Sequence, residues 1–82
     1  MLTTGNQLKA ARALGGVEQI ALAEAAGISV GTIRNMEAQG PATLKSSLAI
    51  IKAVQSALEA RGVQFIPENG GGAGVRLRKV ES

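Results

Sequence analysis

Two short apolar segments separated by a three-residue turn constrain this chain most. The apolar residues spaced for the facing sides of two neighbouring helices are Leu22, Ala26, Ile33 and Met36. In the turn, Gly27 can adopt the positive φ that ends a helix, Ile28 can fill the inner space, and Ser29 can cap the next helix. The stretch 19–38 therefore predicts two helices that cross steeply, a helix-turn-helix motif.

The amino-acid composition excludes several other kinds of site. The chain contains no Cys, His or Asp, which excludes a zinc finger, a Ser-His-Asp triad and a standard EF-hand loop. Phe65 is the only aromatic residue, so modules that stack nucleic-acid bases on aromatic side chains are excluded too. We therefore expect no enzymatic activity, no metal site and no cofactor. The net charge of +3 permits a polyanionic partner without requiring one.

The remaining helices follow from caps and apolar spacing in a chain of 82 residues, which has room for one small domain. Three short helices are expected, over 5–14 with Thr4 as its cap, over 18–26, and over about 29–38. A longer fourth helix is expected to begin after Ser46 or Ser47 and to end before the glycine at position 62. Its expected apolar stripe consists of Leu48, Ile51, Val54 and Leu58.

The last part of the chain predicts a β-hairpin with strands over 63–66 and 75–80, both rich in strand-favouring residues. In the second run, Val75 and Leu77 are expected on one face and the arginines on the other, and Lys79 breaks this alternation. The cationic residues of this run are Arg76, Arg78 and Lys79. They fit either a contact to a DNA backbone or a solvated strand edge that blocks aggregation.

Together these elements predict a mainly α fold, a helix-turn-helix bundle of four to five helices with a C-terminal β-hairpin. Residues 40–46 fit either a loop or an extra turn of the fourth helix.

Residues 1–62 form the expected helix-turn-helix domain, and 63–82 form an extension. Because an isolated hairpin is marginal in water, it must lean on the helices or pair with another chain. The surplus apolar face of the 47–61 helix and the unpaired strand edges of the hairpin make these two elements the expected dimer interface.

Several short motifs carry a resemblance to a known family. They are Ala-Arg-Ala-Leu at 11–14, Gln19, Leu22-Ala23, Ala26-Gly27-Ile28-Ser29, Thr32-Ile33-Arg34 and Glu37. With these residues the chain resembles the XRE-family, phage-repressor-like DNA-binding domains over about residues 4–62. The resemblance implies a sequence-specific regulator of transcription that binds double-stranded DNA, with a recognition helix at about 29–38 in the major groove.

The resemblance also implies roles for individual residues. Base edges would be contacted by Val30, Gly31, Thr32, Arg34 and Asn35. DNA phosphates would be contacted by Gln19 and Ser29, with Lys45 as a further candidate near the recognition helix. Arg12 and Glu37 would form an ion pair that positions the recognition helix. Asn35 can pair bidentately with adenine, and Arg34 can reach guanine or a phosphate, although either could also be solvated surface.

Partners and location follow as further expectations. A single recognition helix gives little specificity, so a homodimer is expected. The alternative function is an antitoxin-like or adaptor protein that mainly binds another protein, which an exposed Ile20 would favour. The longest aliphatic cluster, 48–51, is far shorter than a membrane span, so we expect no membrane association. The expected location is the bacterial cytoplasm, at the nucleoid.

Overall fold

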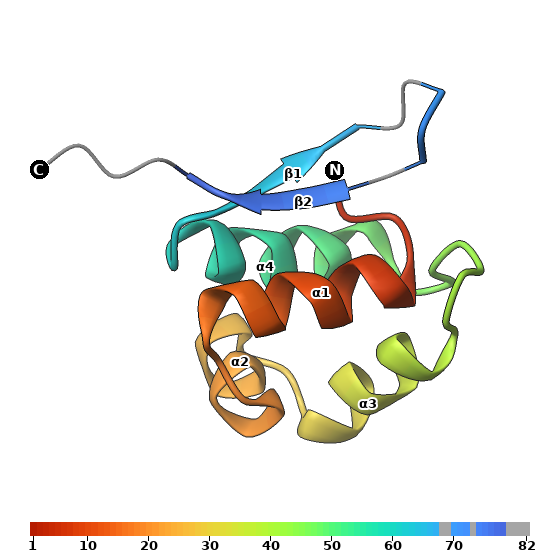
Figure 1. Ribbon diagram of the computed structural model, residues 1–82. Helices are drawn as coiled ribbons and strands as arrows, with labels where there is room; N and C mark the ends of the chain where they lie inside the picture. The colour runs from red at the N-terminus through yellow and green to blue at the C-terminus, as the bar shows by residue number, and fades with distance from the viewer. Residues whose placement is uncertain (68–69, 73, 79–82) are drawn as a thin grey trace, which may run out of the picture.

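The computed structural model describes residues 1–67, 70–72 and 74–78, and within them it contains four helices followed by a two-stranded antiparallel hairpin. The elements are α1 (Gly5–Gly15), α2 (Gln19–Ala26), α3 (Val30–Ala38), α4 (Leu48–Glu59), β1 (Val63–Ile66) and β2 (Gly74–Leu77). Figure 1 shows the hairpin above α1 and α4, with α2 and α3 below them. The mainly helical fold with a C-terminal hairpin is therefore the predicted one.

Hydroxyl side chains cap three of these helices, as the sequence predicts. The Oγ1 of Thr4 accepts a hydrogen bond from the N–H of Gln7 at 3.1 Å, so it satisfies one of the free donors at the start of α1. Ser29 caps α3 in the same way, and Ser47, rather than Ser46, caps α4. Gly27 ends α2 with a φ of 72°, a left-handed conformation that glycine adopts without strain.

The core is a single cluster to which every helix and β1 contribute. Its largest fully buried side chains are Leu2, Leu8, Leu22, Ile33, Met36, Val54, Leu58 and Val63. Phe65 from β1 belongs to the same cluster, and Val75 from β2 packs against it. The hairpin is thus a structural part of the domain, rather than an extension that follows a complete helical core.

The predicted apolar stripe of α4 is wrong at one residue, Leu48. This residue is 56% exposed, while Ile51, Val54 and Leu58 are buried. The cause is helical geometry. At about 100° per residue, Leu48 lies about 120° around the helix axis from Val54. Ile50 and Ala57, on the opposite flank of the stripe, pack against the core instead. The buried face of α4 is therefore turned away from Leu48.

The hairpin pairs Val63 with Leu77 and Phe65 with Val75 across the two strands. Val63 and Phe65 are buried, but Leu77 is 51% exposed, so its side chain is only half covered by the core below it. The second strand ends at Leu77, earlier than the predicted 75–80, and residues 79 and 80 lie outside the described part of the chain.

A polar side chain ties the hairpin to α1. Gln7 is 4% exposed, and its Nε2 donates to the carbonyl oxygen of Gly74 at 3.0 Å. Its Oε1 accepts from the N–H of Thr3. A buried amide needs partners for both of its polar atoms, and these two contacts supply one for each. Gln7 therefore fixes the start of β2 over the N-terminal half of α1.

The segment between α3 and α4 is a loop, which settles the choice left open for residues 40–46. Its Leu44 is buried, and the N–H of Leu44 donates to the carbonyl oxygen of Thr3 at 2.8 Å. The N–H of Asn6 donates to the carbonyl oxygen of Gly40 at 2.9 Å. The loop is therefore held against the start of α1.

Gly5, at the start of α1, lies directly against the end of α3. A Cβ at this position would be 2.9 Å from the carbonyl oxygen of Glu37 and closer still to that of Met36. Real Cβ atoms do not approach backbone oxygens so closely, so the two helix ends meet only because residue 5 has no side chain.

In the described part of the chain, the longest helix has 12 residues, and no helix has the length and apolar character needed to cross a membrane.

We predict opposite effects of two glycine-to-alanine substitutions on the free energy of unfolding. Gly5→Ala should lower it by about 1–3 kcal/mol, because the methyl group overpacks the contact between α1 and α3. Gly31→Ala should raise it by up to about 1 kcal/mol, because a methyl group at Gly31 meets only the Oγ of Ser29 at 3.8 Å and alanine favours the helix. Urea unfolding monitored by circular dichroism measures both, and a tolerated Gly5→Ala would contradict the close approach.

Candidate nucleic-acid interface

α2, the turn and α3 form the expected helix-turn-helix arrangement, with one side of each helix buried. Leu22 and Ala23 of α2 are buried, as are Ile33 and Met36 of α3. The N–H of Ile28 in the turn donates to the carbonyl oxygen of Ala23 at 3.0 Å, which closes the end of α2. Because Ile33 and Met36 point inward, the opposite side of α3 faces solvent.

The residues expected to contact base edges differ in how far they reach into solvent. Gly31, Arg34 and Asn35 are exposed. Thr32 is half-buried, and its Oγ1 lies 2.9 Å from the Oγ of the capping Ser29. Val30 is half-buried and its side chain packs against the core. Much of this side chain therefore points inward and not toward a ligand on the outer side of α3. Among the five residues expected to contact base edges, the exposed polar side chains are therefore those of Arg34 and Asn35.

The residues expected to contact phosphates differ in their exposure and in the hydrogen bonds that they form within the protein. Gln19 is half-buried at the start of α2 and forms hydrogen bonds within the protein. Ser29 is exposed, but its hydroxyl already accepts from the N–H of Thr32 at 3.2 Å. Lys45 lies in the loop after α3, where its N–H donates to the Oε1 of Gln39. Lys45 is not among the residues that line the surface hollow next to Gln19.

Arg12 of α1 and Glu37 of α3 form an ion pair, the contact implied by the family resemblance. The Nε of Arg12 donates to Oε2 of Glu37 at 2.8 Å, and its Nη2 donates to Oε1 at 3.2 Å. The side chains are only 21% and 8% exposed, respectively. A bidentate pair fixes both distance and orientation, so it holds the second half of α3 against α1.

The ion pair further favours the charged form of Arg12. The hydrogen bond to Glu37 raises the pKa of the guanidinium above its ordinary value, burial opposes this rise, and the nearby charges of Glu37 and Glu18 add to it. Its Nη1 also donates to the carbonyl oxygen of Val17 in the connection between α1 and α2, at 3.4 Å. Arg12 therefore links three segments of the fold.

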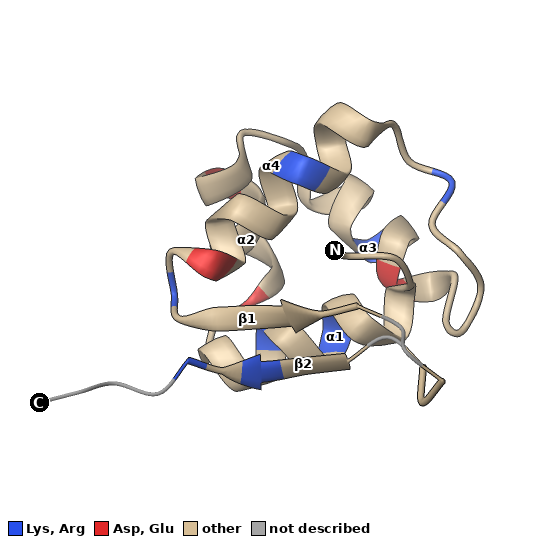
Figure 2. Cartoon of the chain, turned by 90° about the horizontal axis from the view of Figure 1, so that it is seen from above, with Lys and Arg blue, Asp and Glu red and all other residues tan. Residues whose placement is uncertain are grey.

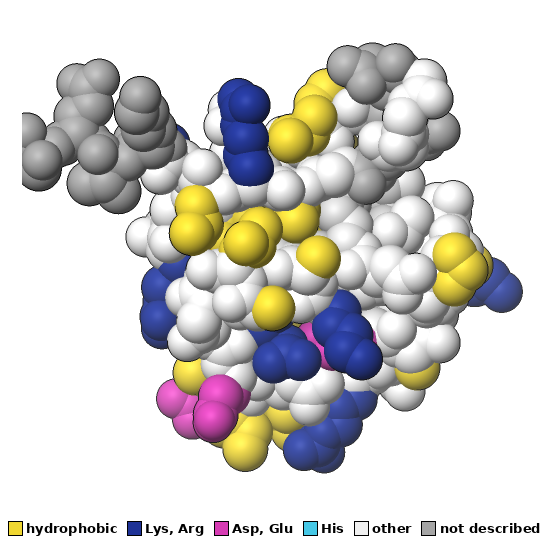
Figure 3. Space-filling view, in the orientation of Figure 1, with side chains coloured by type: hydrophobic (Ala, Val, Ile, Leu, Met, Phe, Trp, Pro, Cys, Tyr) yellow, Lys and Arg dark blue, Asp and Glu magenta, His cyan; other side chains and the backbone are white. Residues whose placement is uncertain are grey.

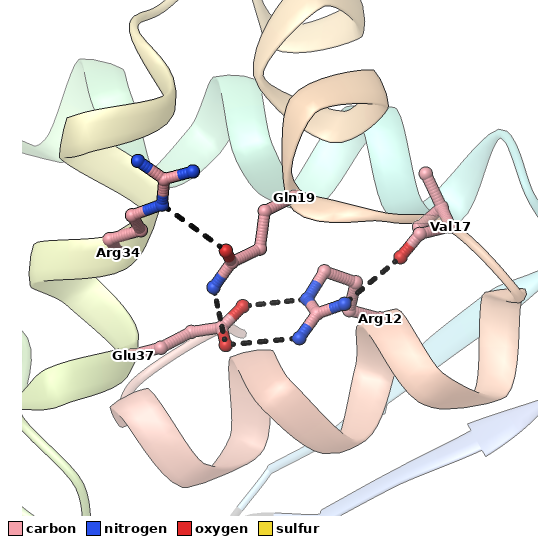
Figure 4. Close-up of polar contacts among 5 residues, drawn as sticks. All are labelled: Arg12, Val17, Gln19, Arg34 and Glu37. Atoms are coloured by element: carbon pink, nitrogen blue, oxygen red, sulfur yellow. Dashed lines mark hydrogen bonds and ion pairs between the residues drawn. The ribbon is translucent and has the colours of Figure 1, made fainter.

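Gln19 and Arg34 continue this network toward solvent (Figure 4). The Nε2 of Gln19 donates to Oε1 of Glu37 at 3.2 Å, and its Oε1 accepts from the Nε of Arg34 at 3.4 Å. The contacts run from the α1–α2 connection through α1, α3 and α2 to the exposed side of α3. Nothing in the spacing of Gln19 and Arg34 along the sequence indicates this contact.

A surface hollow lies beside the network, and we call it the α1–α3 hollow. Its lining residues are Lys9, Arg12, Glu18, Gln19, Ile20, Arg34 and Glu37. Figure 3 shows cationic side chains around a carboxylate on this face, below a group of apolar side chains. Lys9 is a residue that the sequence reasoning missed. Its place three residues before Arg12 in α1 puts both on one helix face, and that spacing could have revealed it.

Comparison with known proteins adds no assignment: the chain matches no protein-family model and no curated protein sequence.

We predict that Glu37→Gln lowers the free energy of unfolding by about 1–3 kcal/mol, because Arg12 loses its charged partner in a largely buried setting. Glu24→Gln is the matched control, since Glu24 is an exposed carboxylate of α2, and it should change stability by at most about 0.5 kcal/mol. Urea unfolding of both variants measures the difference. Equal effects would contradict an anchoring role for the ion pair.

Proposed function

We propose that this protein binds double-stranded DNA through α3 and regulates transcription. The observation that carries the proposal is the orientation of α3. Its Ile33 and Met36 are buried and its Glu37 is paired with Arg12, while Arg34 and Asn35 are exposed on its outer side. A short, firmly held helix with polar residues on its free side matches the requirements for reading a major groove.

The two exposed side chains have complementary roles in this proposal. Asn35 carries an amide that can bond adenine bidentately. Arg34 can donate to guanine or to a phosphate. Gly31 allows a close approach of the helix backbone, because its position presents no side chain. With Val30 packed inward, few direct base contacts remain, so the shape of the DNA contributes to the choice of site.

Positive charge near α3 supports binding to a polyanion. The α1–α3 hollow is lined by the cations Lys9, Arg12 and Arg34 and by the carboxylates Glu18 and Glu37, so its lining carries one net positive charge. Arg12 is paired with Glu37. The chain as a whole carries a net charge of +3. Cations that replace counterions on DNA phosphates give an affinity that falls as the salt concentration rises.

We test the proposal with duplexes selected by the protein from a random pool and with unselected duplexes. We expect wild-type affinity to fall with salt on both. Asn35→Ala should cost about 1–3 kcal/mol on the selected site and little on unselected DNA, because the side chain reads a base. Gln64→Ala, which removes an exposed amide from the hairpin, is the control and should leave binding unchanged. No detectable binding to any duplex at low salt would refute the proposal.

We also propose that the protein is a homodimer, with an interface that differs from the one expected from the sequence. Most of the surplus apolar face expected on the 47–61 helix is taken up by the core, since Ile51, Val54 and Leu58 are buried, while Leu48 stays exposed. The outer edge of β2 and the adjoining surface of α1 offer the better candidate. Figure 2 shows β2 on the side of the hairpin away from α4.

The edge of β2 has backbone groups available for another strand. The N–H of Arg78 donates to the carbonyl oxygen of Gly62, and hydrogen-bonded pairs alternate along an antiparallel ladder. The backbone groups of Val75 and Leu77 therefore point away from β1. Leu14 and Leu77 are 39% and 51% exposed, and apolar side chains gather over α1 and the hairpin in Figure 3. Arg76 is turned to the other face, where its Nε bonds Gln64 at 2.8 Å.

Two exposed leucines discriminate between the possible interfaces. Leu77→Asp should dissociate the dimer, because it places a charge at the edge of β2. Leu48→Asp changes an equally exposed leucine on α4 and should leave the dimer intact. Measurements of mass in solution over a range of concentrations distinguish these results. Dissociation by Leu48→Asp alone, or a wild-type monomer at every concentration, would contradict the proposed interface.

One observation favours the alternative of a protein-binding role. Ile20 is 57% exposed and lies in the lining of the α1–α3 hollow, among polar and charged side chains. An apolar side chain in that position suits a protein partner as well as the methyl group of a thymine. A partner protein that binds tightly and is lost on Ile20→Ser, with DNA binding retained, would support this second role.

A further inference from the structure

We infer that Gln19 acts as a positioning residue for Arg34, which then binds DNA through its two terminal nitrogens. The inference rests on the proposed function and assigns a role within that site. It departs from the sequence-based expectation, in which Gln19 itself contacts a phosphate.

The chemistry of the neighbouring groups fixes the orientation of the Gln19 amide. Glu37 is an acceptor, so the side of Gln19 that faces it must be the NH₂ group. The carbonyl oxygen of Gln19 then points the other way, toward Arg34, which has only donors to offer. Glu37 is itself held by two hydrogen bonds from Arg12. The orientation is thus set from the ion pair outward.

The contact also determines which atoms of Arg34 remain for a ligand. Only the Nε of Arg34 is used by Gln19, at 3.4 Å. Figure 4 shows both terminal nitrogens of the guanidinium pointing away from Gln19. This end of the guanidinium has the fork geometry that fits two acceptors at once, such as O6 and N7 of guanine or two phosphate oxygens.

Holding Arg34 in place lowers the cost of binding. A long exposed arginine loses side-chain freedom when it binds a ligand, and a side chain that is already ordered loses less. Removing the Gln19 amide should therefore weaken binding by about two- to tenfold, which is the factor that ordering one such side chain represents.

A double-mutant cycle tests the inference. The variants are Gln19→Met, Arg34→Met and the double substitution, because methionine keeps a similar unbranched length without the polar groups. Affinity for the selected duplex should fall about two- to tenfold on Gln19→Met in the wild-type background. It should not change on the same substitution in the Arg34→Met background, because the side chain that Gln19 positions is absent.

The hairpin supplies a matched control. Gln64 accepts from the Nε of Arg76 at 2.8 Å, which is the same pairing of an amide oxygen with an arginine Nε at the other end of the molecule. Gln64→Met should leave DNA affinity unchanged. Urea unfolding of each variant establishes that binding is compared between folded proteins.

Each outcome decides between named alternatives. Equal losses on Gln19→Met in both backgrounds would mean that Gln19 acts independently of Arg34, through DNA itself or through Glu37, and this inference would be wrong while the proposed function stood. No loss in either background would also overturn it. A wild-type protein that binds no duplex would overturn the proposed function and this inference together.

Discussion

The contact between α1 and the second half of α3 is the interaction on which the rest of the structure depends. At one point the absence of a side chain at Gly5 lets the helix ends meet, and at another Arg12 binds Glu37 through two hydrogen bonds. One contact is steric and the other is electrostatic, and both act on residues 36–40. The first half of α3 has one side exposed to solvent. It is capped by Ser29 and anchored in the core by the buried Ile33.

The same contact between α1 and α3 also determines how charged side chains are arranged at the candidate interface. The buried carboxylate of Glu37 satisfies Arg12 and orients Gln19, so one acidic residue organises polar groups from three helices. This use of Glu37 also removes Arg12 from the set of free cations, and it leaves Lys9 and Arg34 as the positive groups at the α1–α3 hollow. Stability and the electrostatics of the candidate interface therefore share one carboxylate, and a change at Glu37 affects both.

Local signals predicted the helices well because capping and turn formation involve residues close in sequence. Thr4, Ser29 and Gly27 have the roles that their chemistry favours. Predictions about which side of a helix is buried were less accurate. The apolar stripe of α4 was expected to include Leu48, but this residue lies too far around the helix axis from Val54 and is exposed. Contacts between distant residues, such as Gln19 with Arg34 or Gln7 with Gly74, depend on how the helices pack, so neither composition nor spacing indicated them.

The burial of Val63 and Phe65 in the same core as Leu8 and Ile33 has a consequence for how the chain acquires its structure during synthesis. The helices leave the ribosome before the hairpin, yet the apolar surfaces of α1 and α4 that the hairpin covers stay exposed until β1 and β2 arrive. The contacts that complete the domain join residues far apart in sequence, such as Gln7 and Gly74. The nascent helical segment is therefore open to aggregation or to chaperone binding, and final folding follows release of the hairpin.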